Sequence, residues 1–176
     1  MSLTLAVLSF VTLQRAAELV LSSRNTARLY RRQAYEVGAA HYPLLVALHA
    51  TWLGGLWLLA WDRPINLGFL GAFMILQGLR IWVLATLGPR WTTRIILVPG
   101  EQLITKGPYR FVRHPNYLIV AGEIVCLPLV FDLVGYAAVF GLVTVLLLWI
   151  RIRSEDAALA GARKRSQDRT ATMQGS

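Results

Sequence analysis

Long apolar stretches constrain this chain more than any other feature of its sequence. Three of them run from Ser2 to Leu21, Pro43 to Trp61 and Leu67 to Leu87, and a fourth runs from Tyr117 to Ile150. Each of the first three matches the roughly 20 helical residues that cross the hydrocarbon core of a bilayer. Because 56% of the 176 residues are hydrophobic, the sequence predicts an all-α integral membrane protein.

The fourth apolar stretch is too long for a single crossing. Pro128 and the segment from Asp132 to Gly135 provide a break near its middle. We expect a helical hairpin, Tyr117 to Phe131 and Val134 to Ile150, whose first helix rises only about 22 Å. The sequence thus predicts five transmembrane helices within one membrane-embedded domain, residues 1–163, and a polar, disordered tail, residues 164–176.

Basic residues divide unequally between the two sides of this arrangement. Of the 18 Lys and Arg, fifteen fall in the loops on one side, only Arg63 falls on the other, and Arg15 and Arg80 lie within spans. The positive-inside rule places the N-terminus outside and the C-terminus in the cytoplasm. The net charge of +9 therefore reports membrane topology, and we expect no nucleic-acid partner.

The sequence offers few residues that could bind a metal ion. The single cysteine, Cys126, lies inside an apolar run, and the three histidines are far apart in the sequence. A thiolate cluster or a disulfide needs more than one cysteine. We therefore expect neither a metal site nor an internal disulfide.

One loop on the basic side is long and varied enough to form a site. It runs from Gly88 to Asn116, and contains a short β-branched segment, Thr93 to Val98, and turn signals around Pro99 and Gly107. We expect an ordered cytoplasmic cap over the helices. The alternative is that its basic residues only contact anionic lipid headgroups.

The end of this loop carries a recognisable motif. The stretch from Gly107 to Tyr117 reads GPYRFVRHPNY, which resembles the G-x-Y-x-x-x-R-H-P-x-Y signature of the isoprenylcysteine carboxyl methyltransferase family. A second element, an arginine followed four residues later by a glutamate, matches Arg151 and Glu155. The resemblance covers the C-terminal half of the chain and implies a membrane-embedded enzyme that uses S-adenosylmethionine.

Residue chemistry in the motif agrees with such a cofactor. Aromatic and apolar side chains can sandwich an adenine, a carboxylate can accept from ribose or ammonium groups, and the start of a helix can hold a carboxylate. The family pattern adds the segment from Glu101 to Ile104, mainly through its backbone, and Arg94 is a further candidate. The cofactor-binding residues predicted here are Gln102, Leu103, Ile104, Tyr109, Arg113, His114, Pro115, Asn116, Tyr117 and Glu155.

Two residues are predicted to be catalytic. By resemblance, Arg151 faces the methyl-accepting group, where a guanidinium can orient a carboxylate or stabilise a phenolate. Its alternatives are snorkelling to headgroups and a simple surface pair with Glu155. Glu123 lies inside a span, where an ionisable group is costly and is expected to have a function and a partner. Arg80 is the candidate partner, and a purely structural pair is the alternative.

A second polar group lies in the first span. Gln14, Arg15 and Glu18 form a seam there, for which helix association is the preferred interpretation.

The function predicted from these features is S-adenosylmethionine-dependent O-methylation of a lipid-soluble acceptor drawn from the bilayer. The acceptor is a phenolic or pyrone lipid hydroxyl, which the resemblance to small family members favours, or an isoprenylcysteine carboxylate. Asp156 stands where the family usually has a second glutamate. The alternatives are a sterol-type reductase using NADPH and a non-enzymatic protein that binds anionic lipids.

The predicted topology can be tested with reporter fusions. A reporter fused after Arg165 should lie in the cytoplasm, and one inserted near Asp132 should lie on the opposite face, because the basic residues divide fifteen to one. A cytoplasmic signal from the Asp132 insertion would mean that the hairpin enters and leaves on the same side.

Overall fold

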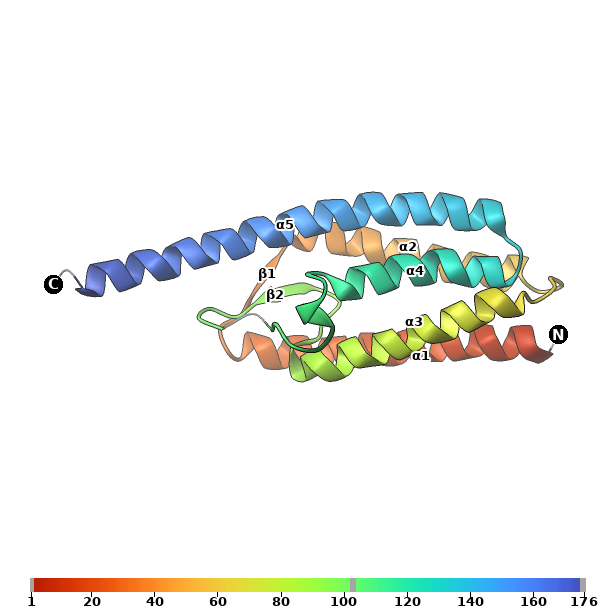
Figure 1. The fold of residues 1–176 in the computed structure, drawn as a ribbon, viewed down its shortest axis with the longest axis horizontal. Coiled ribbons are helices and arrows are strands. Elements are labelled where there is room, and N and C mark those ends of the chain that lie inside the picture. The colour runs from red at the N-terminus through yellow and green to blue at the C-terminus, as the bar shows by residue number, and fades with distance from the viewer. Residues whose placement is uncertain (1, 102–103, 175–176) are drawn as a thin grey trace.

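The computed structural model describes residues 2–101 and 104–174, with the side chains of residues 3–101 and 104–161. Its α-helices run alongside one another as a bundle (Figure 1). They are α1 (Ser2–Tyr30), α2 (Tyr42–Leu59), α3 (Leu67–Leu87), α4 (Pro115–Val130) and α5 (Val134–Gln174). The cap lies at one end of the bundle, where α1 and α3 end and α4 begins, and the turn between α4 and α5 lies at the other (Figure 1).

Four of the described helices, α1, α2, α3 and α5, are long and apolar enough to cross a membrane. The chain is therefore an all-α integral membrane protein. The fifth helix, α4, is a shorter apolar helix of 16 residues, about 24 Å at 1.5 Å per residue. Five full crossings stay a prediction.

Local sequence explains where these helices begin and end. Asn66 caps α3, because its Oδ1 accepts hydrogen bonds from the N–H groups of Gly68 and Phe69 at 3.0 and 3.3 Å. Pro115 is the first residue of α4, a position that needs no N–H donor. The predicted break in the last apolar stretch is confirmed, since α4 ends at Val130 and Asp132 adopts a φ of 56°.

The helix α5 extends well beyond the expected Ile150. Its backbone is helical to Gln174, whereas the sequence predicted a disordered tail from residue 164. The physical reason is composition, because residues 162–174 contain no glycine or proline and several good helix formers. The division into a domain and a tail stays a prediction.

The core of the bundle lies around α4. Ile124 and Leu127 are fully buried there, and they pack with α1, α2 and α3 side chains such as Leu8, Trp52 and Phe73. The Trp52 indole N–H donates to the backbone carbonyl of Ile124 at 3.1 Å. The apolar burial and this hydrogen bond together hold α2 against α4.

A group of four charged side chains and one amide is largely buried among α1, α3 and α4, and we call it the charged cluster: Arg15, Glu18, Gln77, Arg80 and Glu123. Glu123 accepts from Arg15 Nη2 and Arg80 Nη1, both at 2.7 Å, and from Gln77 Nε2 at 2.8 Å. Glu18 accepts from both arginines, by Arg15 Nη1 at 3.1 Å and by Nε and Nη2 of Arg80. The predicted pair between Glu123 and Arg80 is present. Two residues of the predicted seam of α1 belong to the same cluster, and the third, Gln14, donates to Glu18 Oε1 at 3.2 Å.

A small antiparallel sheet ties the first loop to the cap. Strand β1 (Tyr35–Val37) pairs with β2 (Ile95–Leu97), with Glu36 opposite Ile96. β2 lies within the β-branched segment singled out in the sequence, whereas its partner strand carries no comparable signal. Three short 3-10 helices, η1 (Ala39–His41), η2 (Gly88–Arg90) and η3 (Gly107–Arg110), complete the connections.

The charged cluster generates a stability prediction. Replacing Arg80 by leucine leaves two buried carboxylates with Arg15 as their charged partner, so Arg80→Leu should cost on the order of 3–5 kcal/mol of folding free energy. The measurement is the melting temperature in detergent.

Two further variants make this test specific. Arg24→Leu removes an exposed arginine from α1 and should change the melting temperature little. The double variant Arg80→Leu/Glu123→Leu keeps the Arg15–Glu18 pair and the balance of charge, and should melt above Arg80→Leu. Equal melting of the Arg80→Leu and Arg24→Leu variants would contradict a structural role for the cluster.

Candidate functional site

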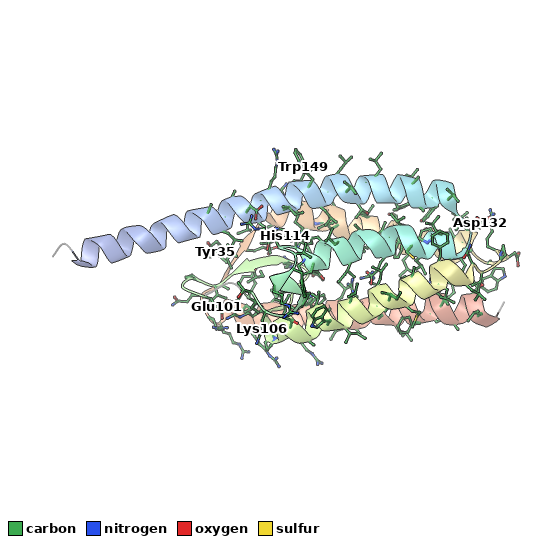
Figure 2. The ribbon with its side chains drawn as sticks, viewed as in Figure 1. Tyr35, Glu101, Lys106, His114, Asp132 and Trp149 are labelled. Atoms are coloured by element: carbon green, nitrogen blue, oxygen red, sulfur yellow. The ribbon has the colours of Figure 1, made fainter. Side chains whose placement is uncertain are left out.

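A cavity of about 620 Å³ lies between the cap and the part of α5 from Arg151 to Ala160. Its wall comes from the ends of α1 and α3, from β1, from the loop on both sides of β2, from the start of α4, and from α5 between Arg151 and Ala160. Tyr35, Glu101 and His114 lie at this end of the molecule, far from Asp132 (Figure 2). The volume is in the usual range for a small-molecule site.

Arg151 is held in the cavity wall by two hydrogen bonds. The residue is only 8% exposed. Nε donates to the Tyr117 hydroxyl at 3.0 Å, and Nη2 donates to the Thr93 carbonyl at 2.5 Å. Among the described residues, Nη1 makes no hydrogen bond. One edge of an anchored guanidinium is thus available to a ligand.

The Tyr117 hydroxyl lies between Arg151 and Glu155. It accepts from Arg151 and donates to Glu155 Oε2 at 2.7 Å. The two residues on α5 therefore share one target. Arg151 and Glu155 are thus linked through the Tyr117 hydroxyl and do not form a direct surface pair.

His114 stacks on the ring of Tyr117, with the ring centroids 5.4 Å apart and an interplanar angle of 10°. Its Nδ1 lies 3.7 Å from Glu155 Oε2, and its Nε2 lies 3.5 Å from Asp156 Oδ1. Both acidic residues also line the cavity. The aspartate that replaces the family's second glutamate is therefore next to the motif histidine.

Three polar atoms of cavity-lining residues are buried without a hydrogen-bond partner in the described part of the chain. They are His114 Nε2, Asn116 Oδ1 and the indole nitrogen of Trp91. A buried polar group left without a partner costs about 1–3 kcal/mol. A polar ligand in the cavity would offer donors and acceptors to such atoms.

The local structure also accounts for the first glycine and the first tyrosine of the motif, Gly107 and Tyr109. Gly107 has a φ of 60°, and a Cβ there would lie 2.9 Å from Cγ2 of Thr86 on α3, so a larger residue would be strained. Tyr109 follows in η3 and lines the cavity. Burial and the charge of Glu155 raise the pKa of Tyr109 to about 12, so its phenol stays a hydrogen-bond donor at neutral pH.

Most predicted cofactor residues come together in the cavity wall. These are Ile104, Tyr109, Arg113, His114, Asn116, Tyr117 and Glu155. Pro115 is buried at the start of α4 beside them, and Gln102 and Leu103 lie outside the described residues. Their roles as ligands of a cofactor stay predictions.

Three other candidates have protein partners. Arg94 lines the cavity, but its Nη1 contacts both oxygens of Glu36 at 2.7 and 3.0 Å, and these bonds raise the pKa of Arg94. Glu101 accepts from Arg32 at 2.8 Å and pairs with Arg90 at 2.7 Å. Glu123 belongs to the charged cluster and is not part of the cavity wall, so its catalytic role stays a prediction.

The structure adds site residues that sequence reasoning did not single out. Tyr35 of β1, Trp91 and Leu29 line the cavity. Ser22 and Thr93 support the wall behind Arg151. Three of these five come from the first loop or α1, where no motif lies, and the pairing of β1 with β2 helps to bring that loop to the site.

Comparisons with known proteins agree with the motif. The family model of the isoprenylcysteine carboxyl methyltransferases matches residues 69–161, more than half of the chain. An uncharacterized protein of Bacillus subtilis, YpbQ, is 35% identical over 158 residues, which cover 87% of this chain and 94% of that protein. An uncharacterized protein of Haemophilus influenzae is 26% identical over 154 residues, 83% of this chain and 88% of that protein. No solved structure matches.

The resemblance expected from the sequence is thereby confirmed. The matched region contains α4 with its motif, the loop that forms β2 and η3, and the part of α5 that carries Arg151 and Glu155. Family membership supports a membrane methyltransferase in general. The chain belongs to the isoprenylcysteine carboxyl methyltransferase family.

Proposed function

We propose that this protein is an S-adenosylmethionine-dependent O-methyltransferase whose acceptor is a lipid-soluble molecule from the bilayer. The observation that carries the proposal is the anchored guanidinium of Arg151, whose Nη1 makes no hydrogen bond among the described residues. It lies in the same cavity wall as three buried polar atoms that make no hydrogen bond there. Family membership supports the reaction class.

The residues of the cavity suit the cofactor. His114, Asn116 and Trp91 have the unpartnered polar atoms, Tyr109 and Tyr117 offer aromatic surface, and the volume of about 620 Å³ leaves room for part of an acceptor as well. We assign these residues, with Glu155, to holding S-adenosylmethionine. When bound, that molecule supplies an electrophilic methyl group.

In this proposal Arg151 acts on the acceptor oxygen. Its Nε and Nη2 are occupied by Tyr117 and the Thr93 carbonyl, so Nη1 is the atom assigned to the acceptor. A donor that is fixed in advance stabilises developing charge on an oxygen without reorganising during the reaction. The surrounding wall keeps acceptor and methyl donor aligned, which is the main requirement of such a transfer.

For the acceptor we favour a phenolic or pyrone lipid over an isoprenylcysteine carboxylate. The support is sequence resemblance to small family members, with His-Tyr-Pro at residues 41–43 and Arg-His-Pro-Asn-Tyr at residues 113–117. We place the cavity on the cytoplasmic side, where basic residues of the cap meet anionic headgroups.

Ligand binding provides the first test. S-adenosylhomocysteine should raise the melting temperature of the protein in detergent, because a ligand that binds only the folded state stabilises it. NADPH should have no effect. Asn116→Ala should weaken the shift, since it removes one of the unpartnered buried atoms, whereas Ser23→Ala, an exposed site on α1, should keep it. Stabilisation by NADPH alone would favour the reductase alternative.

Turnover provides the second test, with tritiated S-adenosylmethionine and two probe acceptors, 3-pentadecylphenol and N-acetyl-S-farnesylcysteine. Arg151→Ala should lower kcat by roughly 10²–10³, the scale seen when one fixed donor to a reacting oxygen is removed. Its affinity for S-adenosylhomocysteine should stay close to that of the wild type. Arg151→Lys should recover only part of the rate, because an ammonium lacks the planar two-donor geometry.

The matched variant on α5 is Glu155→Ala, one helical turn away. It should weaken binding of S-adenosylhomocysteine more than Arg151→Ala does. Equal loss of binding in both variants would contradict this division of roles. Methyl transfer to neither probe would exclude both proposed acceptor classes.

A further inference from the structure

The backbone of Thr93 connects three parts of the molecule. Its N–H donates to Ser22 Oγ on α1 at 2.9 Å, and its carbonyl accepts from Arg151 Nη2 on α5 at 2.5 Å. Its hydroxyl lies 2.8 Å from Ser22 Oγ and 3.1 Å from the hydroxyl of Tyr42, the first residue of α2. Thr93 is thus the point at which α1 and α2 reach Arg151.

The α1 side of this junction is buried and continues for one helical turn. Ser22 is 3% exposed and Asn25 is 1% exposed. Asn25 Nδ2 donates to the carbonyls of Trp91 at 2.8 Å and Gly88 at 3.3 Å. One face of α1 therefore holds the backbone of residues 88–93 at three points.

Neither Ser22 nor Thr93 lines the cavity, although Thr92 and Arg94 do. An effect of Ser22 on a bound molecule must therefore pass through the cavity wall. The direct connection is the Thr93 carbonyl, which is one of the two anchors of Arg151, the other being the Tyr117 hydroxyl. A long side chain held at one point can rotate, whereas one held at two points keeps its free nitrogen in place.

We propose that Ser22 is a positioning residue for Arg151, and that it acts by fixing the Thr93 peptide whose carbonyl holds the guanidinium. The proposal rests on the proposed function only in the identity of the group that Arg151 contacts. It assigns a part in the site to α1, which lies outside the matched residues 69–161. The essential part of Ser22 is its oxygen, the acceptor for the Thr93 N–H.

A double-mutant cycle tests this inference without any assumption about the reaction. Wild type, Ser22→Ala, Arg151→Ala and the double variant are melted in detergent without ligand. Because the two side chains act through one peptide, the loss of melting temperature caused by Ser22→Ala should be clearly smaller in the Arg151→Ala background. Ser23→Ala is the matched control, since its exposed hydroxyl donates only to Val20 O among the described residues. If the losses of melting temperature of the two single variants added up in the double variant, the inference would be overturned.

The same four proteins are then assayed with the methyl acceptor that the wild type accepts. Ser22→Ala should lower kcat about tenfold and leave the KM for S-adenosylmethionine within twofold. The double variant should be no slower than Arg151→Ala alone. If the losses of kcat caused by the two single substitutions multiplied in the double variant, the inference would be overturned. A rise in the KM for S-adenosylmethionine in Ser22→Ala, with kcat unchanged, would also overturn it. A wild type that transfers no methyl group would overturn the proposed function, and the melting cycle would still decide the role of Ser22.

Discussion

The structure depends on the requirement that charges inside a bilayer have partners. Arg15 and Glu18 of α1, Arg80 of α3 and Glu123 of α4 meet this requirement together, because each carboxylate accepts hydrogen bonds from both arginines. Removing either arginine would leave two carboxylates with one charged partner in a medium of low dielectric constant. The cluster therefore fixes α1 against α3 and against α4, the helix that begins within the family motif.

That constraint extends to the candidate site. Once α1 is held in the bundle, its C-terminal part presents Ser22 and Asn25 to the backbone of the cap. The cap backbone in turn presents the Thr93 carbonyl to Arg151, and Tyr117 at the start of α4 completes the anchoring. The site is thus built by helices from both halves of the chain, although its motif lies in one.

Sequence reasoning reached the features that have a local signal. Apolar length located the spans, Pro128 and Asp132 located the break between α4 and α5, and the motif from Gly107 to Tyr117 located one part of the cavity wall. It did not find the pairing of β1 with β2 or the role of the Thr93 carbonyl. A backbone group has no side-chain signature, and such pairings depend on how distant segments meet. It also ended α5 at Ile150, because loss of apolar character marks the membrane boundary and not the end of a helix.

Binding of S-adenosylmethionine in the cavity under the cap can be tested by ultraviolet cross-linking. Radiolabelled S-adenosylmethionine is irradiated with the detergent-purified protein, with and without excess S-adenosylhomocysteine, and the labelled peptides are mapped. We expect competable label within residues 91–117 or 151–160, which include most of the residues that line the cavity. Label confined to the apolar groove of α1 and α3, lined by Ala6, Phe10 and Leu70 among others, would contradict it.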